Sequence, residues 1–185
     1  FICAFCVQAN NVIKVGISSD RRYGPVMNYE LALKIARRLD AIGFRPDHAA
    51  RIVLVGYSGG GEMAIGTAEI LQQLCRVRVQ VIAVCGVFSG NGALASVEDV
   101  AMVVGTRDPV AALGRIAYPG RLSLLPLTNW NRWQRRHQLQ RYPIEGMNHN
   151  GASGPFSVAF RGAVVEAICS ELERSAQSPA LTTLR

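Results

Sequence analysis

The segment Gly56-Tyr57-Ser58-Gly59-Gly60 is the sequence feature that most constrains the fold of this chain. Residues 51–55 precede it as a short apolar run rich in β-branched side chains, which predicts a strand buried on both faces. Apolar residues at helical spacing follow it, from Ala64 to Leu74. A Gly-x-Ser-x-Gly motif between a strand and a helix predicts a tight turn that lifts the serine hydroxyl above the edge of a sheet.

The residues around Ser58 have separate expected roles in this turn. The backbone of the serine is strained there, and side chains at Gly56 and Gly60 are expected to collide across the turn. Gly59 starts the next helix, so its N–H is expected to point at the position where an oxyanion would form. Tyr57 completes the predicted elbow.

The rest of the chain alternates predicted strands with predicted helices. Further strands are predicted at 79–87, 100–104 and 142–146, and residues 122–127 form another apolar stretch. One helix is predicted from Asn28 as its N-cap to Ile42, before Gly43 and Pro46, and a closing helix over 156–172. This order predicts an α/β fold with a mostly parallel sheet, formed by one domain over 1–174 and a flexible tail over 175–185.

Two polar residues follow later strands in an order that suits acyl-transfer chemistry. Asp108 comes after the strand at 100–104 through a short loop, and His149 comes after the strand at 142–146. The chain order is therefore nucleophile, acid and base. We expect His149 to take the proton of Ser58, Asp108 to orient the imidazole, and the Gly59 N–H to hold part of the oxyanion.

Other histidines and acids are less well placed for these roles. His48 precedes the strand that leads to Ser58, and His137 lies among arginines in a predicted surface helix. Glu98 and Asp99 come before the strand at 100–104, and Glu145 is expected inside the last strand. Asp108 itself has a plainer interpretation as a loop residue that caps a turn before Pro109.

Three loops together resemble those of the α/β-hydrolase superfamily: Gly56-Tyr57-Ser58-Gly59-Gly60-Gly61, Gly105-Thr106-Arg107-Asp108-Pro109 and Gly146-Met147-Asn148-His149-Asn150-Gly151. They correspond to the later half of that fold. In more detail the chain resembles a group of bacterial, especially cyanobacterial, α/β-hydrolases that also share Arg22-Tyr23-Gly24-Pro25 and Pro119-Gly120-Arg121. The resemblance implies the fold and the triad, and it implies no particular ligand.

The 185 residues are few for a complete hydrolase of this kind, and the chain opens on Phe1 within an apolar stretch. We expect the early strands and a second oxyanion donor to lie upstream. No apolar run reaches the roughly 18 to 20 residues that a membrane-spanning helix needs, although an anchor upstream of Phe1 stays open. Five scattered cysteines favour a reducing compartment, so a cytoplasmic location is expected, with or without membrane association.

The net charge of +7 comes mainly from arginine, and no acidic residue lies between Asp108 and Glu145. Tryptophan and arginine together suit the headgroup level of an anionic membrane, while a solvated basic helix with an aromatic packed inward is the alternative. The residues concerned are Arg132, Trp133, Arg135 and Arg136. No recognition motif accompanies the charge, so no nucleic-acid partner is expected.

No cofactor and no metal is predicted. Cys3-x-x-Cys6 lacks a second cysteine pair or a nearby histidine, which favours two ordinary apolar cysteines over half of a zinc site. Residues 56–61 could instead be a phosphate loop of a nucleotide-binding domain, but Ser58 stands where the second glycine of that motif belongs.

The sequence therefore predicts a serine hydrolase of esterase or lipase type acting on an ester, including lipid esters, a thioester or an amide. Two alternatives stay open. One is an acyltransferase that uses the same serine, and the other is a binding or scaffold protein that keeps the fold without the activity.

Overall fold

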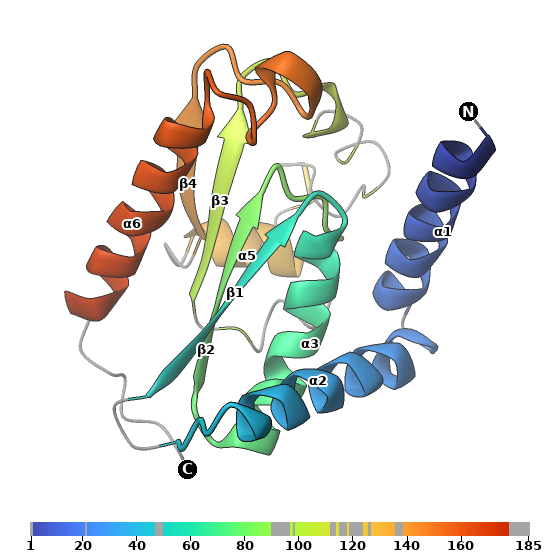
Figure 1. The fold of residues 1–185 in the computed structure, drawn as a ribbon, viewed down its shortest axis with the longest axis vertical. Helices are drawn as coiled ribbons and strands as arrows, with labels where there is room; N and C mark the ends of the chain where they lie inside the picture. The colour runs from blue at the N-terminus through green and yellow to red at the C-terminus, as the bar shows by residue number, and fades with distance from the viewer. Residues whose placement is uncertain are drawn as a thin grey trace.

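The computed structural model describes residues 2–20, 22–46, 50–89, 97, 99–111, 114, 118, 124–125, 127–135 and 139–177. Within these residues, four strands form one parallel sheet in the order β1-β2-β3-β4 (Figure 1). Their bounds are Arg51–Tyr57 (β1), Arg78–Val84 (β2), Asp99–Gly105 (β3) and Leu139–Ile144 (β4). The predicted α/β class with a parallel sheet is confirmed.

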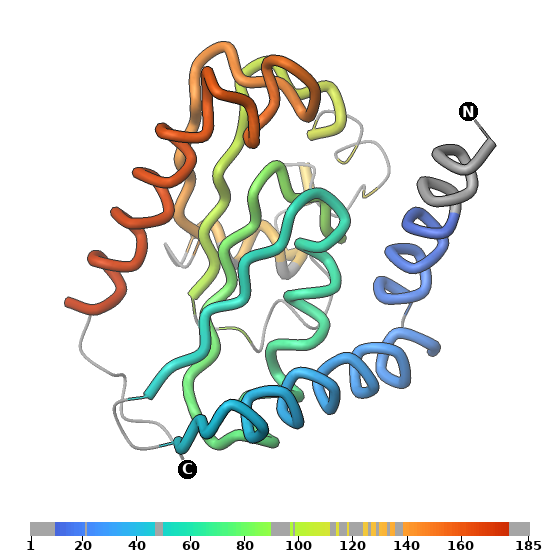
Figure 2. The backbone as a smooth tube through the Cα atoms, in the orientation of Figure 1, coloured from blue at the N-terminus to red at the C-terminus, as the bar shows by residue number. Residues whose placement is uncertain are grey.

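Helices cover both faces of this sheet. Their bounds are Ile2–Ser19 (α1), Gly24–Ala41 (α2), Gly60–Cys75 (α3), Asn129–Arg135 (α5) and Arg161–Gln177 (α6). α3 packs on β1 and β2, and α6 packs on β3 and β4. α2 lies against α3, and α1 contacts α2 and α3 at the margin of the molecule (Figures 1 and 2).

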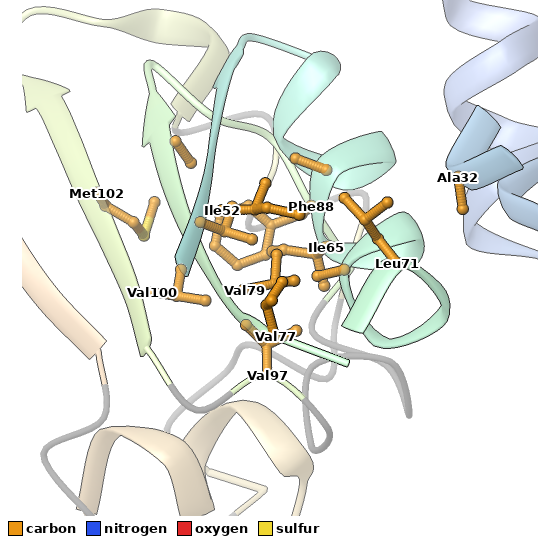
Figure 3. Close-up of a cluster of buried hydrophobic side chains, with 14 of the residues drawn as sticks. Ala32, Ile52, Ile65, Leu71, Val77, Val79, Phe88, Val97, Val100 and Met102 are labelled. Atoms are coloured by element: carbon orange, nitrogen blue, oxygen red, sulfur yellow. The ribbon is translucent and has the colours of Figure 1, made fainter. Parts of the chain in front are cut away.

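Two apolar clusters fill the space between the sheet and these helices. The cluster under α3 includes Ile52, Ile65, Leu71, Val79 and Phe88 (Figure 3). The cluster under α6 includes Ile82, Val84, Val103, Val164 and Ala167. Successive residues of β2 and β3 enter opposite clusters, as expected when a strand is buried on both faces.

The helix predicted from Asn28 begins one turn earlier, so its predicted N-cap was wrong. Pro25 occupies the first turn of α2, where its fixed φ suits a helix and its missing N–H costs no hydrogen bond. Asn28 is instead buried inside α2, where its side chain accepts a hydrogen bond from Ser18 Oγ at 2.7 Å. The predicted stop is confirmed, because α2 ends at Ala41 and Gly43 follows with φ +81°.

Later elements also differ from the sequence-based bounds. α6 begins at Arg161 and continues to Gln177, so Phe156 precedes it and Ser175 lies buried within it. The predicted tail therefore begins no earlier than 178, and residues 178–185 lie outside the described residues. In the apolar stretch 122–127, the described Leu124, Leu125 and Leu127 are exposed and belong to no strand. Among the helices that the structure describes, none has the length and apolar character to cross a membrane.

Candidate active site

The site lies at the carboxyl ends of the strands, which share one edge because the sheet is parallel (Figure 1). Ser58 follows β1 directly, Asp108 follows β3 after two turn residues, and His149 follows β4 after a four-residue loop. These three predicted site residues therefore meet across a sheet whose order brings the ends of β1, β3 and β4 to the same side.

Ser58 has the strained backbone that the motif predicts, with φ +53°. Its N–H donates to Val84 O at 3.0 Å, and its carbonyl accepts from Val87 N at 3.1 Å and Gly61 N at 3.0 Å. A Cβ on Gly56 would strike the backbone of Gly60, which confirms the steric need for glycine at 56. The same expectation for Gly60 was wrong, because a Cβ there would meet nothing within 4 Å.

His149 bridges Ser58 and Asp108 through its two ring nitrogens. Nε2 lies 2.9 Å from Ser58 Oγ, and Nδ1 lies 3.0 and 3.1 Å from the two carboxylate oxygens of Asp108. The Asp108 side chain is fully buried and that of His149 is 10% exposed. Because an ionised carboxylate only accepts hydrogen bonds, this contact assigns the ring proton to Nδ1 and leaves Nε2 free to accept from the serine hydroxyl.

Asp108 also serves the plainer role expected of it. Its Oδ1 accepts hydrogen bonds from Val110 N at 2.8 Å and Ala111 N at 3.1 Å, so the carboxylate caps the turn that begins at Pro109. The Arg107 N–H donates to Met147 O at 3.1 Å, which ties the acid loop to the histidine loop. The capping bonds hold the carboxylate in the orientation in which it meets the imidazole.

Tyr57 contacts His149 from the side of β1. Its hydroxyl donates to the His149 carbonyl oxygen at 2.6 Å, and its ring stacks on the imidazole with centroids 5.4 Å apart. Phe156 packs edge-on against Tyr57 at 4.9 Å, although its own side chain is largely exposed. Burial, together with the nearby Cys85 and Asp108, raises the pKa of Tyr57, so its phenol stays protonated and able to donate.

Gly59 stands at the N-cap of α3, one residue after the serine. Within the described residues its N–H makes no hydrogen bond, and the positive end of the α3 dipole lies beside it. The side chain of Val15 from α1 lies against Gly59 so closely that a Cβ at 59 would overlap it. α1 therefore reaches the elbow, a contact that the sequence did not indicate.

Cys85 is a neighbour of the site that the sequence analysis missed. The sequence predicts a strand at 79–87 that includes Cys85. In the structure β2 ends at Val84, and Cys85 lies in the turn that follows, with φ +47°. Its thiol is fully buried and lies within 4.8 Å of a carboxylate oxygen of Asp108. Burial, reinforced by the Asp108 charge, raises the pKa of this thiol to about 12, so it is protonated at neutral pH.

Of the rival acids that the structure describes, Asp99 lies at the other edge of the sheet and Glu145 lies at this one, where Asp108 is the carboxylate bonded to His149. Asp99 pairs with Arg174 at 2.8 Å at the amino end of β3. Glu145 was expected in the last strand, but β4 ends at Ile144 and Glu145 lies in the following turn. His48, Glu98 and His137 lie outside the described residues.

Comparison with known proteins gives a likeness of fold. No protein-family model matches this chain, and no curated protein matches it either. Among solved structures, the Pyrobaculum calidifontis esterase in its monoclinic form is similar, with a TM-score of 0.50 and 14% sequence identity. The match covers 85% of this chain and 62% of that chain, so this chain spans less than two thirds of the esterase's length.

At such low identity the similarity concerns architecture and carries no activity with it. The narrower resemblance to a cyanobacterial group stays a prediction. The comparison shows an α/β fold like that of this esterase, and the α/β-hydrolase superfamily that the sequence resembles stays a prediction.

Proposed function

We propose that this chain is a serine hydrolase that cleaves an ester, including lipid esters, a thioester or an amide through a covalent acyl-Ser58 intermediate. The observation that carries the proposal is the unbroken chain of contacts from Ser58 Oγ to His149 Nε2 at 2.9 Å and from Nδ1 to Asp108 at 3.0 Å. A nucleophile within hydrogen-bond reach of a base that a third group orients is the arrangement this chemistry requires.

In the proposed reaction Ser58 Oγ attacks the substrate carbonyl carbon while its proton moves to His149 Nε2. Asp108 accepts the hydrogen bond from Nδ1 and stabilises the imidazolium that forms. The imidazolium then gives its proton to the leaving group as the tetrahedral intermediate collapses to the acyl-enzyme. Water then attacks the carbonyl carbon of the acyl-Ser58 ester, with His149 again as the base. The acid product leaves, and Ser58 regains its proton from the imidazolium.

The oxyanion of each tetrahedral intermediate is assigned to the N–H of Gly59. That N–H is at the start of α3, where backbone donors and the helix dipole favour negative charge. The αL backbone of Ser58 supports this assignment, because the turn presents the serine hydroxyl and the next N–H to the same side.

A fluorophosphonate probe tests the proposal, because it phosphonylates only an activated serine. We expect the protein to label, and Ser58→Ala and His149→Ala to stay unlabelled. Ser170→Ala is a matched control, since Ser170 is an exposed serine on α6, a helix that packs on β3 and β4, and this variant should be labelled like the parent protein. Labelling of Ser58→Ala at the parental rate, or no labelling of the parent beside a labelled reference hydrolase, would overturn the proposal.

The same covalent intermediate also fits an acyltransferase. Adding glycerol to a p-nitrophenyl ester assay separates the two activities, because a transferase passes the acyl group to the alcohol while a hydrolase releases the free acid. We expect the free acid to dominate. A non-catalytic scaffold protein would give neither product.

Contact with an anionic membrane surface through Arg132, Trp133, Arg135 and Arg136 is a further part of the proposal. Arg132 and Arg135 are exposed on α5, which supports it. Trp130 is buried against Phe88, as the alternative of an inward-packed aromatic expects, and the side chain of Trp133 and residue Arg136 lie outside the described residues. Salt-sensitive sedimentation with phosphatidylserine vesicles, lost in Arg132→Glu with Arg135→Glu, would support this contact.

A further inference from the structure

Among the residues that the structure describes, Cys85 is the buried thiol beside the triad, and the proposed reaction does not use it. Its backbone is fixed where β2 ends, because its N–H donates to Val103 O at 2.8 Å. Its side chain is fully buried, and its Sγ lies within 4.8 Å of a carboxylate oxygen of Asp108 and of a ring nitrogen of His149. A thiol therefore lies next to two members of the triad, Asp108 and His149.

Three atoms that bind metals converge at this point. One ligand atom from each of Cys85, Asp108 and His149 lies within 4.8 Å of the other two, and all three residues are buried. In tetrahedral zinc sites the bonds to S, N and O are about 2.0–2.3 Å long, which sets the ligand atoms roughly 3.3–3.8 Å apart. Small side-chain adjustments would bring the present group to that geometry.

We propose that Cys85, Asp108 and His149 form an inhibitory site for Zn²⁺, and this inference rests on the proposed function of the triad. A thiolate, an imidazole and a carboxylate form a ligand set that zinc favours over Mg²⁺ or Ca²⁺, which prefer oxygen ligands. A water molecule completes the tetrahedron. Zinc here is an inhibitor that competes with the catalytic hydrogen bonds.

The inhibition follows from where the protons go. Bonds form from Zn²⁺ to Cys85 Sγ, to an Asp108 carboxylate oxygen and to His149 Nδ1. The thiol proton is released to solvent, and the imidazole proton leaves Nδ1 and is regained at Nε2, so the ring stays neutral. With a proton on Nε2, His149 can donate to Ser58 Oγ but can no longer accept the proton of that hydroxyl.

The protonated state of the thiol limits how tightly the metal binds. Because burial raises the pKa of Cys85 to about 12, zinc has to displace a proton that a preformed thiolate site would lack. Full burial of the thiol also means that the ion enters only when the loops move, so protein and metal should be incubated together before any assay.

The first test measures the rate of fluorophosphonate labelling with and without ZnCl₂. We expect saturating zinc to slow labelling of the parent protein by about 100-fold, the loss expected when a general base is removed. EDTA should restore the rate, and MgCl₂ should have no effect. The measured quantity is the ratio of rates with and without zinc within each variant, so any change in basal rate cancels.

Cysteine variants assign the effect. Cys85→Ser should be insensitive to zinc, because a hydroxyl of similar size is a far weaker ligand than a thiolate. Cys169→Ala, which removes an exposed thiol on α6, should keep the full sensitivity, and so should Cys3→Ala. Equal inhibition of Cys85→Ser and the parent would overturn the inference.

A second measurement does not depend on activity. In the Ser58→Ala protein, added Co²⁺ should give a near-ultraviolet absorption band from charge transfer between thiolate and metal, and Cys85→Ser in that background should abolish it. A band that depends on Cys85, in a parent protein that never labels, would keep the metal site and reject the hydrolase. Absence of the band, or its survival in Cys85→Ser protein with a parental circular dichroism spectrum, would reject the metal site.

Discussion

Polar side chains, several of them buried, gather at both ends of the same sheet, and the two groups are built differently. At the amino end, the Glu171 carboxylate accepts hydrogen bonds from Gln80 Nε2 at 2.7 Å and Tyr142 OH at 2.8 Å and pairs with Arg174. We call the residues of this group the amino-end cluster: Arg51, Gln80, Asp99, Tyr142, Glu171, Arg174 and Ser175. At the carboxyl end stand Ser58, Asp108 and His149.

The difference concerns backbone as much as side chains. Members of the amino-end cluster sit on β1, β2, β3, β4 and α6, in regular structure whose polar atoms pair with one another and hold α6 on the sheet. The residues of the carboxyl end lie on loops. Ser58 and the neighbouring Cys85 both have positive φ. Polar groups that bond to one another on regular elements stabilise a fold, whereas strained backbone on loops is common at functional sites and supports the function proposed for the carboxyl end.

Asp108→Asn should produce the largest effect. It should lower the activity of the carboxyl-end site and leave the amino-end cluster unchanged. Asparagine keeps an oxygen to cap Val110 and Ala111, but its amide no longer favours the ring proton at Nδ1. We expect kcat for p-nitrophenyl acetate to fall about 10⁴-fold, as when the triad aspartate of a serine protease is replaced. Steady-state kinetics measure the loss, and the melting temperature serves as the control for folding.

A different result would show whether Asp108 acts mainly as a turn cap or mainly as the partner of His149. If Asp108→Asn kept most of its kcat but melted well below the parent, Asp108 would be a turn cap whose contact with His149 is incidental.

Glu171→Ala should have the opposite pattern, with lower stability and unchanged chemistry. The substitution leaves Gln80, Tyr142 and Arg174 without the carboxylate that accepts their hydrogen bonds. In the parent protein the hydrogen bond from Arg174 to Glu171 also raises the pKa of Arg174. We expect the free energy of unfolding to fall by about 3 kcal/mol, the scale for removing one partner of a buried charged network. Urea denaturation measures this.

Labelling of Ser58 in Glu171→Ala, measured well below its melting temperature, should proceed at the parental rate. Glu166→Ala is a matched control, because Glu166 is an exposed glutamate on the same helix. Equal stability of the two variants would show that the amino-end cluster contributes little, and the comparison between the two ends would fail.

The sequence predicts the parallel sheet because buried strands leave continuous apolar runs, as in β2 and β3. It fails where tertiary contacts decide the outcome. Asn28 has the chemistry of an N-cap, but Pro25 starts the helix earlier and Ser18 takes up the asparagine side chain. Ser175 is polar, so the sequence predicts that the exposed tail begins there. The residue is instead buried on α6, where its hydroxyl forms hydrogen bonds with Arg51 and Gln80.

The candidate site was predictable as far as motifs and chain order reach. Ser58, Asp108 and His149 each follow a strand, and parallel strands bring such positions to one edge. Cys85 also follows a strand, but its apolar neighbours extend the predicted run past the true end of β2. The approach of Val15 to Gly59 joins segments that no local pattern connects.

Replacing Ser58 by glycine and by alanine should show the strain at the carboxyl end as a difference in stability. Both variants lose the hydroxyl, but φ +53° costs alanine roughly 1–2 kcal/mol that glycine avoids, against a greater entropy cost for glycine of about 0.5–1 kcal/mol. We expect Ser58→Gly to be the more stable variant by about 0.5–1 kcal/mol. Urea denaturation of the pair measures the sign.

The same two substitutions at Ser170 form the control, because this residue lies inside α6. There alanine should be the more stable variant by about 1 kcal/mol, as in any exposed helix interior. If alanine were also the more stable residue at 58, the elbow would be unstrained and the contrast with the amino-end cluster would disappear.

Tyr57→Phe should have a similarly modest effect, and it tests how the histidine loop is held. Phenylalanine keeps the ring that stacks on His149 and contacts Phe156, and it removes only the hydroxyl that donates to the His149 carbonyl at 2.6 Å. Losing about 1 kcal/mol of hydrogen bonding should reduce kcat/KM about 5-fold if that bond positions the imidazole. Because the bond fixes the backbone of the base and leaves its ring chemistry alone, the pH profile of kcat/KM should keep its shape. A shifted profile would mean that Tyr57 acts on the protonation of His149 and belongs with the reacting groups.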